Sequence, residues 1–359
     1  MAEEKKSIIG IQYLRAYAAI LVVINHFCNN DIYIFNLLRF DIIGGFGVDI
    51  FFIISGFIMA YTLSEFSSLS SKQTAISFIK KRIMRIYPIY LIILIPFIAL
   101  YLLKYHLGMT HLSLHSIIGS ILIIPSITND ENYHMLNVPA WTLVYEMFFY
   151  ITLSITISFS KNKRSSLIIY SLLVILTLAF VHIFNLQGER LKWVNLQYMI
   201  GDPIFLDFIL GFFLFYLKKI NISMSFPAWS MLPLLLLVTS ISMVLATKEY
   251  PRFISYGLTA FIIVSIFTLN KSMHYSNNQL LLFLGGASYS IYLTHPLFLP
   301  FHSILSDRYS SLSKSIPFDI LLVIISIALG CMVHKKIELN IERIIKNKIQ
   351  NKKTRITNL

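Results

Sequence analysis

Apolar residues occur along the chain in repeated blocks, and short polar or basic segments separate these blocks. A transmembrane helix needs about 20 consecutive, mostly apolar residues. The pattern predicts such helices near residues 8–27, 46–63, 86–103, 141–159, 166–184, 201–217, 231–247, 253–269, 280–301 and 316–334. The predicted fold is therefore an all-α polytopic membrane protein with about ten transmembrane helices.

The basic residues predict how these helices are oriented. With ten spans and both termini in the cytoplasm, most Lys and Arg residues fall on the inner side, as the positive-inside rule requires. The short apolar stretch 114–128 is not counted, because an eleventh span would place the basic loop 161–164 outside. We expect it to be an interfacial or re-entrant helix. The chain divides into a membrane domain, residues 1–334, and a basic cytoplasmic tail, residues 335–359, on the anionic inner leaflet.

The amino-acid composition is typical of a membrane protein and argues against nucleic acid as a partner. Of 359 residues, 56% are hydrophobic and 13% are charged, whereas about a quarter of the residues in a soluble domain are charged. The net charge of +13 comes mostly from loops between apolar blocks, so we expect membrane lipids and not nucleic acid as the partner. Cys28 and Cys331 are predicted at opposite faces, which argues against a disulfide, and no metal site is predicted.

Ionisable residues within the predicted spans suggest chemistry, because each costs about 2.5–3.5 kcal/mol to insert. Arg15 and His26 are eleven residues apart in the first span, so they share a helix face, about 16 Å apart along the axis. Arg15 belongs to the inner half and His26 to the outer boundary. Three other spans carry Asp49, Glu146 and His295 in their outer parts. We expect these three residues and His26 to converge.

The inner side is cationic. Lys81, Arg82 and Arg85 enter the third span and add to Arg15, and clustered Arg residues bind phosphates. The alternative is ordinary anchoring at the inner membrane surface. For the outer cluster, a histidine oriented by a carboxylate is suited to deprotonating a hydroxyl. The alternative there is a polar pair that fixes helix packing.

Five ordered blocks resemble a known family, the integral-membrane acyltransferase-3 family, and most closely its bacterial exopolysaccharide O-acetyltransferase branch. They are IQYLRAYAAILVVINHF, FGVDIFFIISGFIM, KKRIMRIYPIY, PAWTLVYEMFFY and GGASYSIYLTHPL, across residues 11–297. The resemblance implies a ten-helix enzyme of the bacterial inner membrane. Such an enzyme transfers acetyl groups from cytoplasmic acetyl-CoA to a hydroxyl of an extracytoplasmic polysaccharide or its lipid-linked oligosaccharide precursor.

The resemblance also implies roles for individual residues. The family's catalytic first-span histidine falls on His26, as a general base or a transient acyl carrier, and the sequence leaves both routes open. The family's arginines associated with the acyl donor correspond here to Arg15, Arg82 and Arg85. We add Lys81, which belongs to the same basic run as Arg82 and Arg85, as a further donor-binding residue. Asp49 or Glu146 is expected to orient His26. The expected substrate-binding residues, which would stack on a sugar or stabilise an oxyanion, are Trp141, Tyr145, Tyr289 and His295.

Two other functions remain open from the sequence. A transporter or flippase of a lipid-linked saccharide also needs intramembrane charges, but its inverted repeats with broken helices are not visible. A membrane-embedded polymerase would favour a large external loop rich in Arg, whereas the segment 104–140 has Lys104 as its single basic residue. The oligomeric state is left open.

Overall fold

The computed structural model describes residues 8–28, 32–66, 69–127, 133–160, 162–189, 194–274, 276–313 and 315–357. The expected loop residue Lys161 and the last two residues of the predicted tail lie outside these ranges. Within them the chain is almost entirely helical and forms no β-strand. The all-α fold predicted from the sequence is thereby confirmed.

Long apolar helices occupy the predicted spans. They are α2 (Ile8–Phe27), α4 (Ile43–Ser64), α5 (Ser71–His106), α7 (Trp141–Phe159), α8 (Lys163–Ile183), α10 (Phe205–Lys219), α11 (Met231–Thr247), α12 (Thr259–Leu269), α13 (Gln279–Thr294) and α16 (Ile316–Val333). In the described part of the chain, eight helical stretches are long and apolar enough to cross a membrane, and Phe253–Leu269 is a shorter apolar one. The protein is thus a multi-pass membrane protein, and the number of ten spans stays a prediction.

Shorter elements connect these helices. They are α3 (Tyr33–Leu37), α6 (Leu114–Leu122), α9 (Leu196–Ile200), α14 (Leu299–Arg308), α15 (Ser310–Ser313), the 3₁₀ turns η1 (Val138–Ala140), η2 (Ala228–Ser230), η4 (Lys271–His274) and η5 (His295–Phe298), and the π-helical turns η3 (Phe253–Leu258) and η6 (His334–Glu338). The 19-residue helix α17 (Leu339–Thr357) follows η6.

The α6 helix lies in the stretch that the charges excluded as a span. Its nine residues extend about 13 Å at 1.5 Å per residue, less than half of the hydrocarbon core. It ends at Leu122, because Ile123 adopts a left-handed backbone conformation with φ of 53°. The hydroxyl of Tyr90 on α5 donates to the Ser120 carbonyl at 2.6 Å. This contact holds α6 against α5.

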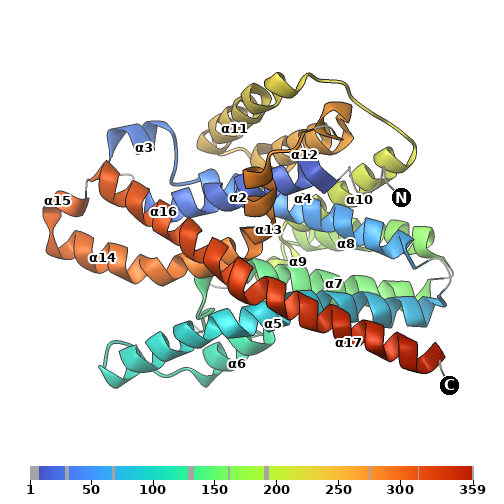
Figure 1. The fold of residues 1–359 in the computed structure, drawn as a ribbon, viewed down its shortest axis with the longest axis horizontal. Helices are drawn as coiled ribbons and strands as arrows, with labels where there is room; N and C mark the ends of the chain where they lie inside the picture. The colour runs from blue at the N-terminus through green and yellow to red at the C-terminus, as the bar shows by residue number, and fades with distance from the viewer. Residues whose placement is uncertain are drawn as a thin grey trace.

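Helix α2 is central to the bundle. It packs against α4, α12, α13 and α16, while α4 packs against α10 and α5 against α7. The first residues of α2 and the last of α17 lie toward the same side of the bundle, on the right in Figure 1. The view also shows α16 and α17 following one another as one long rod, joined by the π-helical turn η6.

Glycines allow α4 and α10 to approach closely. A Cβ atom added to Gly56 would lie 2.1 Å from the Phe208 carbonyl oxygen, and one on Gly211 would lie 2.3 Å from the Ile53 carbonyl oxygen. Small residues are the usual means by which membrane helices bring their backbones together. The position of α4 in the bundle therefore depends on these two glycines.

Replacing Gly56 with alanine is expected to lower the free energy of unfolding by about 1–3 kcal/mol, since the obstructing atoms are backbone atoms that cannot rotate away. Unfolding in detergent measures the change. Ser64→Ala on the same helix is the control, because Ser64 is exposed and its hydroxyl donates only to the carbonyl of Tyr61. Equal stability of the two variants would contradict the close α4–α10 packing.

The α5 helix begins at Ser71, well before residue 86, where the sequence predicts the span. Its start is fixed by a capping box in which Ser70 and Gln73 satisfy each other's backbone N–H groups. Lys and Arg are good helix formers, so the basic run continues the helix inward without a break. Arg82 and Arg85 consequently lie on a rigid helix at the end of the bundle that the charges predict to be the inner one.

Candidate functional site

A cavity of about 360 Å³ lies inside the bundle and is lined by α2, α4, α5, α7, α13, η6 and α17. Five of the residues singled out in the sequence line it: Arg15, Arg82, Arg85, Glu146 and Tyr289. The polar residues gather where the predicted inner ends of the helices meet. The outer part is bordered by apolar side chains together with Thr142 and Tyr292.

The guanidinium groups of Arg15 and Arg85 line this cavity, and most of their N–H donors make no hydrogen bond with the described residues. Arg15 donates to the Gln12 side chain at a long 3.4 Å. Arg85 lines the same cavity and repels Arg15 electrostatically. Arg85 makes no hydrogen bond or ion pair with the described residues. The same cavity is also lined by Glu146, Glu338 and Glu342. Because the two guanidinium groups repel each other and keep free N–H donors, they can still bind an anionic ligand between them.

Arg82 differs from these two because the fold already uses it. It is 4% exposed, and its Nη2 donates to Thr62 Oγ1 at 2.7 Å. The guanidinium also lies 5.4 Å from the centre of the Phe78 ring and 5.5 Å from that of Tyr150. Arg82 therefore ties α5 to α4 and forms part of the cavity wall.

Lys81 does not join the arginines. Its ammonium group lies 3.4 Å from Glu65 Oε2 and 4.4 Å from the centre of the Phe66 ring, and it does not line the cavity. Consecutive helix residues point about 100° apart. With Arg82 facing inward, Lys81 is consequently turned to the exposed side of α5.

Glu146 lies at the cavity and away from His26. Its Oε1 accepts a hydrogen bond from Ser55 at 2.6 Å, and Ser55 in turn lies 2.9 Å from the Tyr150 hydroxyl. The carboxylate interacts electrostatically with Arg15. Of the expected outer cluster, Glu146 therefore sits with the inner cations.

His26 and His295 form a pair at the C-terminal ends of α2 and α13, with ring centres 4.9 Å apart. The Nδ1 atom of His26 lies 2.8 Å from the Val22 carbonyl oxygen, and that of His295 lies 3.3 Å from the Ile291 carbonyl oxygen. A carbonyl oxygen can only accept, so each Nδ1 carries the proton and each neutral ring keeps its lone pair on Nε2. Backbone carbonyl groups therefore hold both rings in the tautomer with a free Nε2 lone pair, which a general base needs. No carboxylate of the described residues contacts either ring.

Tyr292 connects this pair to the cavity. It lines the cavity, and its ring centre is 6.0 Å from that of His295. Its hydroxyl donates to the Pro139 carbonyl at 3.0 Å. The side chains of Tyr292, His295 and His26 therefore form a continuous path from the outer end of the cavity.

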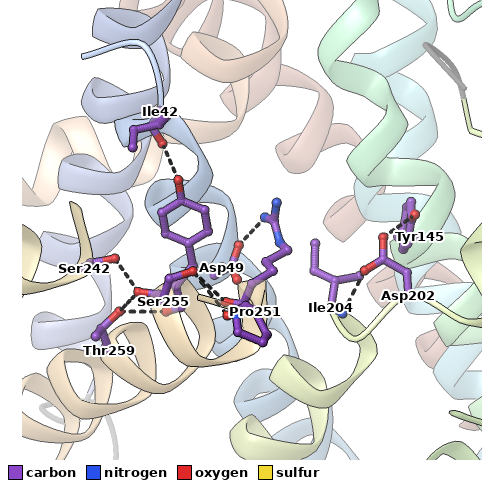
Figure 2. A network of polar contacts seen from close by, with 11 residues as sticks. Ile42, Asp49, Tyr145, Asp202, Ile204, Ser242, Pro251, Ser255 and Thr259 are labelled. Atoms are coloured by element: carbon purple, nitrogen blue, oxygen red, sulfur yellow. Dashed lines mark hydrogen bonds and ion pairs between the residues drawn. The ribbon is translucent and has the colours of Figure 1, made fainter. Parts of the chain in front are cut away.

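Asp49 belongs to a separate polar network near the N-terminal ends of α4 and α10. It is 1% exposed and forms an ion pair with Arg252, a residue that the sequence did not single out. Asp207, also 1% exposed, and Asp202 interact electrostatically with Arg252 as well. Figure 2 shows the part of this network around Asp49 and, beside it, the Tyr145–Asp202 contact; Asp207 is not drawn there.

The remaining aromatic residues divide between the cavity and the core. Tyr289 lines the cavity, and its hydroxyl donates to the Ile86 carbonyl at 3.0 Å. The Tyr145 hydroxyl donates to Asp202 Oδ2 at 2.8 Å, and Trp141 packs against Tyr145 with ring centres 5.5 Å apart. Trp141 and Tyr145 therefore lie in a neighbouring aromatic cluster, not at the cavity surface.

Sequence reasoning missed several cavity residues, including Tyr292, His334 and Glu338. Tyr292 was signalled by its place three residues before His295 in the same block. His334 and Glu338 lie around the predicted end of the last span, where a basic tail was expected. The one sequence signal for this pair was the spacing of four residues between His334 and Glu338, which places the two side chains on the same helix face. The described residues hold no cluster of three or more metal-ligating side chains, and the lack of a metal stays a prediction.

Comparison with known proteins places the chain among acyltransferases. The family model Acyl_transf_3, described as an acyltransferase domain, matches residues 8–335. ExoZ, an exopolysaccharide production protein of Rhizobium meliloti (strain 1021), is 28% identical over 261 residues, which cover 70% of this chain and 76% of ExoZ. An O-acetyl transferase of Shigella phage Sf6 is 26% identical over 271 residues, covering 71% of this chain and 74% of that protein. No solved structure matches the chain.

Proposed function

Because the chain belongs to the Acyl_transf_3 family of acyltransferases, we propose that it transfers an acetyl group from acetyl-CoA to a hydroxyl group of a cell-surface polysaccharide or its lipid-linked precursor. The similarity to a phage O-acetyl transferase supports the transferred group and the O-linkage. The similarity to an exopolysaccharide production protein supports a glycan acceptor. We place the enzyme in the bacterial inner membrane, with the arginine end of the cavity toward the cytoplasm.

The observation that carries the donor assignment is the neighbouring pair of Arg15 and Arg85 in one cavity. Guanidinium groups bind phosphates through charge-assisted, often bidentate hydrogen bonds. The phosphates of acetyl-CoA would bind there, and the pantetheine arm would extend along the cavity toward Tyr292. Arg15 and His26 are about 16 Å apart along α2, a separation suited to an extended arm that carries the thioester toward His26.

His26 then supplies the base. Its Nε2 lone pair accepts the proton of the acceptor hydroxyl, the oxygen attacks the thioester carbonyl carbon, and the C–S bond breaks as the C–O bond forms. The proton passes from His26 to the departing CoA sulfur, which restores the neutral ring. In the second route Nε2 itself attacks the thioester carbonyl carbon and CoA leaves as its thiolate. The acceptor oxygen then takes the acetyl group from the ring, the hydroxyl proton passes to the thiolate, and the imidazole returns to its neutral form.

His295 is positioned to assist His26. It is fully buried, and its Nε2 has no hydrogen-bond partner among the described residues. The ring lies between Tyr292 at the cavity and His26. We assign His295 the role of positioning the His26 ring, against which it packs, for reaction at the thioester end of the donor. Asp49, bound to Arg252, supports the helices that carry this centre.

The proposal is tested by incubating membranes with acetyl-labelled CoA and the polysaccharide of the source cell. Label in the polysaccharide, with release of free CoA, is the expected result. A transporter or flippase would move the saccharide without consuming acetyl-CoA. Membranes that move saccharide but release no CoA would favour that alternative.

Replacing Arg85 with glutamine is expected to raise the KM for acetyl-CoA about 10–100-fold, because a hydrogen bond to a charged group contributes about 1.5–3 kcal/mol. Steady-state rates at several acetyl-CoA concentrations measure it. Lys81→Gln is a matched control, four residues earlier on the same helix and paired with Glu65 outside the cavity. An equal KM in both variants would contradict phosphate binding at Arg85.

A further inference from the structure

His334 and Glu338 form a hydrogen-bonded pair in the π-helical turn η6. The Nδ1 atom of His334 donates to Glu338 Oε2 at 2.7 Å, and the Ser290 hydroxyl on α13 donates to the same oxygen at 2.6 Å. His334 is 7% exposed and Glu338 is 8% exposed. Both nevertheless line the cavity that holds Arg15 and Arg85. The pair is thus a fixed, oriented imidazole at the donor cavity.

The second nitrogen of His334 is directed at space kept open by a glycine. A Cβ atom added to Gly286 would lie 3.3 Å from His334 Nε2, and Gly286 also lines the cavity. The ring is held on its other side by Phe283, with ring centres 5.8 Å apart. Nε2 makes no hydrogen bond with the described residues. A ligand in the cavity can therefore reach it.

This imidazole lies in the part of the cavity that is lined by both arginines and carboxylates. Glu338 interacts electrostatically with Arg15, as Glu146 does. The backbone of Gln12 lies directly against Gly285, and the side chain of Gln12 accepts a hydrogen bond from Arg15. His334, Arg15 and Arg85 consequently border one part of the cavity, with exposed Glu342 at its edge.

We propose that His334 is a donor-binding residue whose Nε2 donates a hydrogen bond to a phosphate group of acyl-CoA, with Glu338 and Ser290 holding the ring in place. The proposal rests on the donor cavity assigned above. Glu338 fixes a proton on Nδ1, and a phosphate beside Nε2 favours a second proton there, because the imidazolium then lies between two anions. If His334 only stabilised the packing of η6 against α13, its Nδ1 atom would be sufficient. A loss of CoA affinity when Nε2 is removed therefore distinguishes donor binding from helix packing.

The test uses His334→Asn, whose amide NH₂ can keep the hydrogen bond to Glu338 while the cavity-facing nitrogen is removed. Binding of CoA, dephospho-CoA and pantetheine to the purified protein in detergent gives three Kd values for each variant. The expected result is a Kd for CoA about tenfold higher than in the unmodified protein, which is about 1.4 kcal/mol, with an unchanged Kd for pantetheine. Dephospho-CoA shows which phosphate is involved, since it lacks the phosphate on the ribose.

His302→Asn is the matched control. The Nε2 atom of His302 pairs with Asp319 at 2.9 Å, in a second His–carboxylate pair that does not line the cavity, so its CoA binding is expected to be unchanged. Thermal unfolding shows whether each variant folds. Should His334→Asn not fold, His334→Gln is measured instead, since its longer amide reaches toward the position of Nε2, and it is expected to bind CoA as the unmodified protein does.

Three outcomes would overturn the inference, and they separate it from the proposed function. Equal CoA affinity of His334→Asn and the unmodified protein, with the latter preferring CoA to pantetheine, refutes the role of His334 but keeps the donor cavity. Equal loss of CoA and pantetheine binding, with a lower unfolding temperature, assigns His334 to helix packing alone. An unmodified protein that does not prefer CoA to pantetheine refutes the donor cavity itself.

Discussion

Replacing His26 with glutamine is expected to lower the rate of acetyl transfer about 10²–10⁴-fold, the usual contribution of a positioned general base. The amide is close to imidazole in size but cannot take up the proton of a hydroxyl. CoA binding is expected to stay within about twofold of the unmodified protein, because His26 does not line the cavity that holds the arginines. Single-turnover transfer of labelled acetyl and equilibrium CoA binding measure the two quantities.

The same variant separates the two chemical routes. If His26 carries the acetyl group, the unmodified protein incubated with labelled acetyl-CoA alone acquires label that His26→Gln does not. If His26 acts only as a base, neither protein is labelled without an acceptor. His302→Gln is the control, since His302 is engaged by Asp319. Near-normal transfer by His26→Gln would rule out both routes.

Replacing Arg252 with methionine is expected to destabilise the folded protein by about 3–5 kcal/mol, the usual cost of removing one partner of a buried ion pair. Asp49 and Asp207 are each 1% exposed, and Asp202 is 7% exposed. Without the guanidinium, these three carboxylates would remain buried with no cation of the described residues beside them. Unfolding temperature in detergent and the yield of folded protein measure the loss.

The control for this prediction is Arg39→Met. Arg39 pairs with Asp41 at 3.0 Å, with exposed side-chain fractions of 36% and 21%, and such pairs contribute about 0–1 kcal/mol. The double variant Asp49→Asn with Arg252→Met removes one of the orphaned charges and is expected to recover part of the stability. Arg252→Met as stable as Arg39→Met would contradict the network drawn in Figure 2.

The sequence was sufficient to predict most helices, because length and hydropathy alone determine which segments can cross a membrane. The predicted span 231–247 has the same bounds as α11. The predicted helix ends were wrong where a helix continues beyond its apolar part. Hydropathy marks residue 86 as a start, yet the capping box begins α5 at Ser71, and the span predicted to end at 301 is interrupted by the 3₁₀ turn η5 after Thr294.

The sequence predicted how far along each helix the candidate site residues lie, but not which neighbouring helix each side chain faces. Spacing along α2 predicted that Arg15 and His26 share a face, and the structure places Arg15 at the cavity and His26 beside His295. The partner of Asp49 was hidden, because Arg252 is 203 residues away in the sequence. Depth alone also placed Glu146 with the histidines, whereas its helix face turns it toward Ser55. Which face meets which neighbour is decided by packing between helices, which one sequence does not contain.

The central claim is that one protein links a CoA-binding cavity at one end of the bundle to a His26 centre that acetylates a hydroxyl at the other. The most direct measurement uses sealed proteoliposomes of the purified protein, with labelled acetyl-CoA outside and the polysaccharide acceptor inside. In the fraction oriented with the arginine end outward, we expect label on the enclosed polysaccharide with free CoA released outside, and neither with His26→Gln. Labelling that requires CoA and acceptor on the same side of the membrane, or that persists in His26→Gln, would contradict the account.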